Sequence, residues 1–116
     1  MEARLQEMIE KAEAANACEE DLTEVKTCKT LEEVKKHKRA PYWAYWYVEN
    51  VVKGRFEQGE EAISKDAEYS YYYAKNVLHD RFPAGERVIS ESALYSCCYT
   101  QDIMKGDETW IQNLQK

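Results

Sequence analysis

The chain has 116 residues with 22 acidic and 16 basic side chains, which gives a formal net charge of −6. This surplus of acids argues against direct nucleic-acid binding, because a general binder needs Lys and Arg to neutralise phosphates. The sequence contains no run of eighteen apolar residues, and its charged N-terminus lacks an apolar signal region, so we expect a soluble cytoplasmic protein with no membrane partner. With only four Gly and two Pro, helices joined by short turns are expected rather than strands.

Residues 1–40 predict an N-terminal cap of two or three helices. Apolar residues at helical spacing mark the first of them: Leu5, Met8, Ile9 and Ala12. A second helical segment follows Asp21. A third begins at Thr30, where Thr30 and Glu33 have the spacing of a capping box.

The rest of the chain repeats with a period of 26 residues. Aligning 43–68 with 69–94 gives eleven identities in 26 positions without a gap, and a partial third copy begins at Tyr95. Repeats of this length are typical of stacked helix pairs, so we predict an all-α fold, a small right-handed α-solenoid capped at both ends. The predicted single domain, 1–116, divides into the cap (1–40), repeat 1 (41–66), repeat 2 (67–92) and a C-terminal capping repeat (93–116).

Each repeat is predicted to contain two helices, giving seven or eight helices in the whole chain. Asp66 and Ser92 are expected N-caps, and Pro41 suits the first turn of its helix. The second helices are expected over 57–64 and 83–90. One repeat position is expected to hold a left-handed residue after the first helix: Gly54, Asp80 and Gly106. At 100° per residue, one stripe of each first helix is predicted to form the core: Trp43, Tyr47, Asn50, Val51 and Gly54, then Tyr69, Tyr73, Asn76 and Val77.

The segments "APYWAYWYVENVVKGRFEQGEEAI" and "AEYSYYYAKNVLHDRFPAGERVI" resemble a known type of repeat. They are similar to tandem aromatic-rich short helical repeats, of the form W-A-Y-x-Y-A-x-[ND]-V-I-K-G-R-[WF]-P, in hypothetical proteins of bacteriophages and some bacteria. The resemblance covers about 40–106 and departs at Glu57, at Asp80 and at Cys97. It implies a phage or bacterial origin and an interaction scaffold, and it brings no catalytic residues.

The polar residues of the repeats are predicted to be structural. Arg55 and Arg81 are expected to pair with the carboxylates of Glu60 or Glu86. The side chains at one repeat position are expected to form hydrogen bonds with backbone groups in the turn of a neighbouring repeat: Asn50, Asn76 and Asp102. Ligand binding is the alternative for this position. The run "KKHKR" at 35–39 complements a helix dipole or meets an acid or phosphate of a partner.

The sequence carries no recognisable catalytic or metal-binding pattern. No nucleophile motif, Gly-rich phosphate loop or metalloprotease motif occurs, so we predict that the protein is not an enzyme and uses no cofactor. The cysteines lack the spacing of a zinc site and are expected to be reduced thiols without a metal: Cys18, Cys28, Cys97 and Cys98.

The aromatic residues on the other side of the first helices are the best candidates for function. Some must pack against the next repeat, and the rest should line an exposed strip that binds a protein partner: Tyr42, Tyr45, Trp46, Tyr71 and Tyr72, with Lys75 beside them. We therefore expect a non-enzymatic protein-binding module. For a phage origin, the expected partner is a host protein in the host cytoplasm, and the small size, the acidity and the resemblance together lead us to expect, as one concrete form, inhibition of a CRISPR effector or another host defence nuclease complex.

Three other functions stay open at this point. A self-associating structural or assembly protein would use the same aromatic strip to form a homo-oligomer. An acidic mimic of nucleic acid would instead use the carboxylates. Binding of single-stranded nucleic acid by stacking has the aromatic rings but lacks a basic groove.

Overall fold

The computed structural model describes residues 1–114, and these residues confirm the predicted all-α class. They form nine α-helices, two of which continue into π-helical turns, so the chain has at least one helix more than the seven or eight expected. The elements are α1 (Ala3–Ala14), α2 (Glu19–Val25), α3 (Leu31–Lys36), α4 (Ala40–Tyr47), η1 (Val48–Val52), α5 (Glu57–Ile63), α6 (Ala67–Tyr72), η2 (Tyr73–Leu78), α7 (Pro83–Ser90), α8 (Ala93–Asp102) and α9 (Thr109–Asn113).

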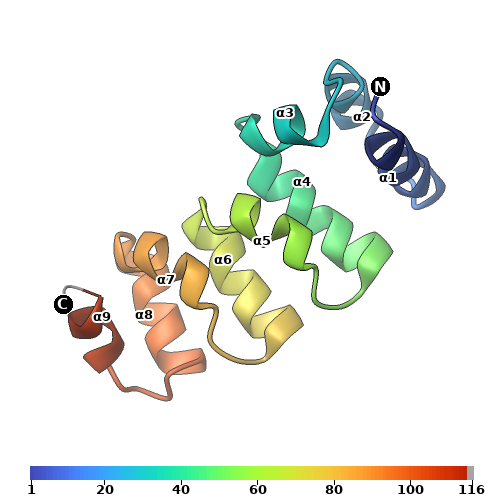
Figure 1. Cartoon of the computed structure of the whole chain (residues 1–116). Coiled ribbons are helices and arrows are strands. Elements are labelled where there is room, and N and C mark those ends of the chain that lie inside the picture. The colour runs from blue at the N-terminus through green and yellow to red at the C-terminus, as the bar shows by residue number, and fades with distance from the viewer. Residues whose placement is uncertain (115–116) are drawn as a thin grey trace.

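The helices from α4 onward lie in two rows. Helices α4, α6 and α8 lie side by side in one row, and α5, α7 and α9 form a second row against it (Figure 1). Helices α1 to α3 cover one end of the array and α9 lies at the other, along a longest dimension of 44 Å. Helix α5 packs on α4 and α7 packs on α6, so these consecutive elements form helix pairs, and Trp110 of α9 contacts Tyr99 of α8.

The predicted capping residues begin their helices as expected. The side chain of each cap accepts a hydrogen bond from the backbone N–H three residues later: Thr30 from Glu33, Asp66 from Tyr69 and Ser92 from Tyr95. The carboxylate of Glu33 accepts in return from the N–H of Lys29, at 3.2 Å. Pro41 and Pro83 lie in the first turns of α4 and α7, where no N–H is needed.

The helix ends differ from the prediction by one residue. The left-handed backbone lies at Lys53, His79 and Lys105, with φ of 55°, 53° and 53°, and not at Gly54 or Asp80; of the three predicted positions, only Gly106 has positive φ. The reason is that these helices end in wider turns. The N–H groups of Lys53 and His79 donate to carbonyls five residues back, so the donor itself becomes the left-handed residue that closes the turn.

The side of the long helices that faces the core also differs from the prediction. Tyr73 is fully buried, as predicted, but Asn50 and Asn76 are exposed, while Tyr45 and Val48 are buried instead. Tyr45 lies on α4 before the π-helical turn, on the side of the helix that packs against α6, so the predicted stripe was drawn on a different side of the helix from the core. The stripe was therefore wrong for both asparagines.

Close contact between the rows depends on glycine. A Cβ added to Gly85 would lie 2.7 Å from the Cβ of Ser70 and 2.8 Å from the ring of Phe82, and both of those residues are buried. At the equivalent Gly59 the added atom would meet mainly the ring of Phe56, at 2.6 Å, and this ring is only partly buried. Helix α7 can therefore approach α6 only because residue 85 has no side chain.

We predict that Gly85→Ala lowers the free energy of unfolding by about 1 to 2 kcal/mol, because overpacking costs more than the helix propensity that alanine adds. Gly59→Ala is the matched control and should lose less, because the ring of Phe56 can move toward solvent. Urea unfolding followed by circular dichroism measures both values. A Gly85→Ala variant as stable as the wild type would contradict the close contact.

Candidate functional site

Tyrosine hydroxyls connect neighbouring helix pairs. The hydroxyl of Tyr73 accepts a hydrogen bond from the backbone N–H of Phe56 at 2.9 Å and donates one to the carboxylate of Glu60 at 2.6 Å. The same contacts recur 26 positions later, at 3.0 and 2.6 Å, among Tyr99, Phe82 and Glu86. Burial, followed by the hydrogen bond to Glu86, raises the pKa of Tyr99. Each tyrosine thus satisfies the turn of the preceding helix pair.

Glu86 is the acidic centre of the second of these contacts. It is only 2% exposed, and both of its oxygens accept from the guanidinium of Arg81, at 2.8 Å each. Burial by itself would raise the pKa of Glu86, but the hydrogen bonds from Arg81 and Tyr99 outweigh it and lower the pKa below its ordinary value. The predicted pairing of Arg81 with Glu86 is confirmed, and Arg55 pairs with Glu60 in the same way, at 3.0 Å.

The repeated Asn and Asp residues have a different role from the one predicted. Asn76 donates to the hydroxyl of Tyr45 at 3.1 Å, and Asp102 accepts from the hydroxyl of Tyr71. Asn50 bonds within its own helix. The expectation that these residues satisfy turn backbone groups was wrong, because the tyrosine hydroxyls do so. One repeat position holds Tyr in all three copies, at 47, 73 and 99. This recurrence could have indicated that tyrosine hydroxyls bond the turns.

Two residues of the predicted aromatic strip are buried. Tyr45 and Tyr71 are 7% and 5% exposed, and they are the members of the set that pack against the next helix in the row, as some were expected to do. The other predicted residues keep contact with solvent: Tyr42, Trp46 and Tyr72 are partly exposed and Lys75 is exposed. Lys75 lies over the ring of Tyr71, with 5.7 Å between its Nζ and the ring centre.

An unbroken row of four partly exposed rings remains, which we call the tyrosine surface: Tyr42, Tyr69, Tyr72 and Tyr95. Successive ring centres are 5.9, 6.4 and 6.2 Å apart, so the rings contact one another from α4 across α6 to α8. The strip predicted from sequence omitted Tyr69 and Tyr95. The hydroxyl of Tyr95 donates to Glu68 at 2.6 Å, which fixes one end of the row.

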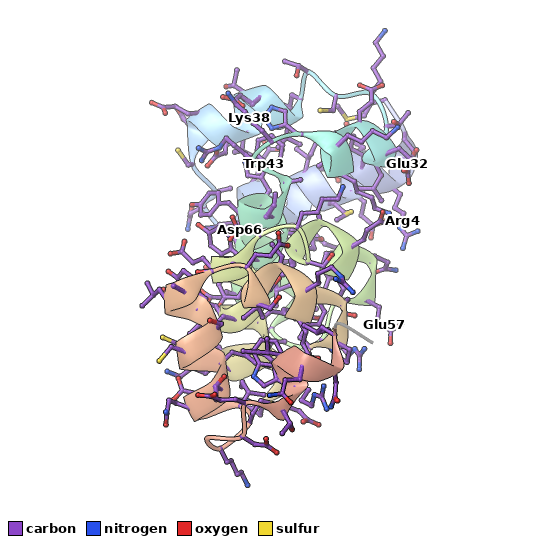
Figure 2. All side chains as sticks on the ribbon, turned by 90° about the vertical axis from the view of Figure 1, so that its left-hand side faces the viewer. Arg4, Glu32, Lys38, Trp43, Glu57 and Asp66 are labelled. Atoms are coloured by element: carbon purple, nitrogen blue, oxygen red, sulfur yellow. The ribbon has the colours of Figure 1, made fainter. Side chains whose placement is uncertain are left out.

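An apolar cavity of about 120 Å³ lies between the N-terminal helices and the first helix pair. Its walls include four of the aromatic residues near the start of α4: Tyr42, Trp43, Trp46 and Tyr47. Figure 2 shows the labelled Trp43 next to the N-terminal helices, with Lys38 above it and Asp66 below. The indole N–H of Trp43 donates to Asp21 at 3.0 Å, and its ring stacks on His37 with 4.4 Å between centres.

The described residues were also compared with the requirements of disulfides, metal sites and membrane-spanning helices. All four cysteines are free thiols, with Cys18 and Cys97 exposed, Cys98 partly exposed and Cys28 buried. Among residues 1–114, no three His, Cys, Asp or Glu side chains gather closely enough to hold a metal ion. Over the same residues, every helix is too short or too polar to cross a membrane. Comparison with protein-family models, curated protein sequences and solved structures gives no significant match to this chain.

Proposed function

We propose that this protein is a non-enzymatic protein-binding module built as a right-handed solenoid of 26-residue helix pairs, with caps over 1–40 and 93–116. The repeated hydroxyl contacts of Tyr73 and Tyr99 support the solenoid arrangement, because equivalent side chains join successive pairs. Such stacks present long rows of equivalent residues on one face, which is where they bind partners.

The tyrosine surface is the observation that supports protein binding. Tyrosine contributes a large apolar area and a hydroxyl with few rotatable bonds, and it is enriched among residues that dominate interface energies. The rings of Tyr69 and Tyr72 are held by each other and by the buried Tyr45. Because these side chains are already ordered, they lose little conformational entropy when a partner binds, and most of the contact energy contributes to the binding free energy.

The charges around this surface argue against nucleic acid as the partner. Glu68 and Asp66 flank Tyr69, and they would repel phosphates, while Arg39 and Lys75 are the basic side chains that lie over tyrosine rings in the described structure. Action on a host defence complex, which the resemblance implies, stays a prediction. Self-association through the same surface is an alternative that the next experiment separates.

The test compares the wild type with Tyr69→Ala/Tyr72→Ala. We expect affinity capture from bacterial lysate, quantified by mass spectrometry, to recover a specific partner at least about tenfold less with this variant, because interface tyrosines contribute 1 kcal/mol or more each. The control is Glu57→Ala/Glu61→Ala, two exposed positions on α5 in the other row. Equal recovery of every partner by both folded variants would contradict the proposal, and a concentration-dependent mass in sedimentation would favour self-association.

A further inference from the structure

We propose that the cavity between α1, α2, α3, α4 and α5 is a binding site for a small neutral apolar molecule of about the size of one aromatic ring. This site shares Tyr42 with the tyrosine surface, but the proposal does not depend on the function of that surface. Of the four tyrosine-surface rings, Tyr42 lines the cavity, whereas the other three do not.

The cavity lies between two separate apolar clusters. Leu5, Ile9 and Cys28 form the buried centre of the N-terminal helices, and a second, larger cluster begins at Tyr45 and Val48 and extends to the other end of the molecule. Residues from both sides face the space between these clusters without filling it. The N-terminal helices therefore form one side of a pocket, and the first helix pair, α4 and α5, forms the other side.

Small side chains create the space. Three alanines on different helices line it: Ala12 on α1, Ala44 on α4 and Ala62 on α5. Gly59 is also in the wall, where the ring of Phe56 lies against it. Larger residues at these positions would close the cavity, so the volume follows directly from the side chains that the sequence places there.

The chemistry of the wall selects an uncharged ligand. The polar group of Asp21 is already occupied by Arg39 Nε and Trp43 Nε1, both at 3.0 Å, and Lys35 pairs with Glu32 at 3.6 Å. The pocket is partly open to solvent, but its wall is almost entirely apolar, so water inside it finds few hydrogen-bond partners and is readily displaced by an apolar group. A charged ligand would lose its hydration without gaining an ion pair.

The size and shape of the wall favour a flat ring. An engineered apolar cavity of roughly 150 Å³ in another protein takes up benzene, so a cavity of about 120 Å³ here is close to the same size. Trp43, Trp46 and Phe56 contribute aromatic faces and edges to the wall. A bound ring restores the dispersion contacts that the wall atoms lack when the cavity is unfilled.

The indole N–H signals of the three tryptophans provide a direct test in the wild-type protein. Benzene is titrated into the ¹⁵N-labelled chain, and the signals are assigned with single Trp→Phe variants. We expect the signals of Trp43 and Trp46 to shift and to saturate, while that of Trp110, which is buried in the other cluster, stays in place. Shifts that do not saturate, or equal shifts of all three signals, would overturn the proposal.

A matched pair of variants on α1 then tests the position of the site. Ala12→Leu fills the cavity and should weaken the benzene affinity at least tenfold, whereas Ala14→Leu places the same side chain on the exposed side of the helix and should leave the affinity unchanged. Unchanged affinity in a folded Ala12→Leu variant would also overturn the proposal. If that variant does not fold, the wild-type titration decides the question alone.

Discussion

Replacing Glu86 by alanine is expected to lower the free energy of unfolding by about 3 kcal/mol, because it removes one partner of a buried ion pair. The substitution leaves the guanidinium of Arg81 without its two 2.8 Å acceptors and the hydroxyl of Tyr99 without its own. Arg81 is half exposed and can turn to water, which keeps the loss at the lower end of the range for such pairs. Urea unfolding followed by circular dichroism measures it.

Glu60→Ala is the matched control, because Glu60 has the same partners 26 positions earlier, Arg55 and Tyr73. The side chain of Glu60 is 15% exposed against 3% for Glu86, so water can replace more of its contacts. We expect a loss of about 1 to 2 kcal/mol for Glu60→Ala, in the range of a charge-assisted hydrogen bond. Equal losses at the two positions would contradict the argument from burial.

The pH dependence gives an independent signature. The pKa of Glu86 is lowered in the folded state, so its ionised form contributes stability that is present above the ordinary pKa of 4.5 and is lost as the pH falls through the folded value. Glu86→Gln cannot show this loss. We therefore expect the difference in unfolding free energy between the wild type and Glu86→Gln to shrink below about pH 4.5. A constant difference down to pH 3 would count against it.

Replacing Trp110 by alanine should also lower the free energy of unfolding by about 3 to 5 kcal/mol, as for other buried tryptophans. Trp110 is 1% exposed, its ring centre lies 4.8 Å from that of Tyr99, and its indole N–H donates to the hydroxyl of Thr100 at 2.9 Å. Removing the indole would expose the ring of Tyr99 to solvent and would remove one hydrogen-bond partner from the buried hydroxyl of Thr100. Thermal and urea unfolding measure the effect.

Two further variants separate the causes of that loss. Trp110→Phe keeps one aromatic ring but removes the hydrogen bond and part of the buried apolar area, so we expect a smaller loss than for Trp110→Ala, of about 2 kcal/mol. Ile111→Ala, on the same helix but partly exposed, should cost less than Trp110→Ala. A loss below about 1 kcal/mol for Trp110→Ala would mean that α9 contributes little to the last helix pair.

Much of the fold could be predicted from the sequence, because local signals decide where helices begin. Pro83 and the end of the apolar pattern set 83–90, which is the observed α7, and Asp66 and Ser92 cap their helices as expected. The π-helical turns could not be predicted in this way. They depend on how the end of each long helix packs, and they placed the left-handed residue at Lys53 and His79, one residue before the predicted positions.

The candidate sites were less accessible to sequence reasoning, for two physical reasons. Arg81 and Glu86 are five residues apart, so their pairing follows from local geometry, whereas the hydroxyl of Tyr99 reaches a turn seventeen residues away. The cavity depends on alanines from three helices, including Ala12 and Ala62, and such a coincidence in space has no signature along the chain.

The hydroxyl contacts of Tyr73 and Tyr99 both point from a later helix to an earlier turn. The N–H of Phe82 and the carboxylate of Glu86 are completed by Tyr99, which is made thirteen residues after Glu86. During translation, the carboxylates of Glu60 and Glu86 therefore gain their hydrogen bonds from Tyr73 and Tyr99 only after the following helix has left the ribosome. A truncation after residue 90 would leave the carboxylate of Glu86 without the hydrogen bond from Tyr99, whereas loss of the first helix pair would free only uncharged groups of α6 and η2, on Ser70, Tyr73 and Asn76.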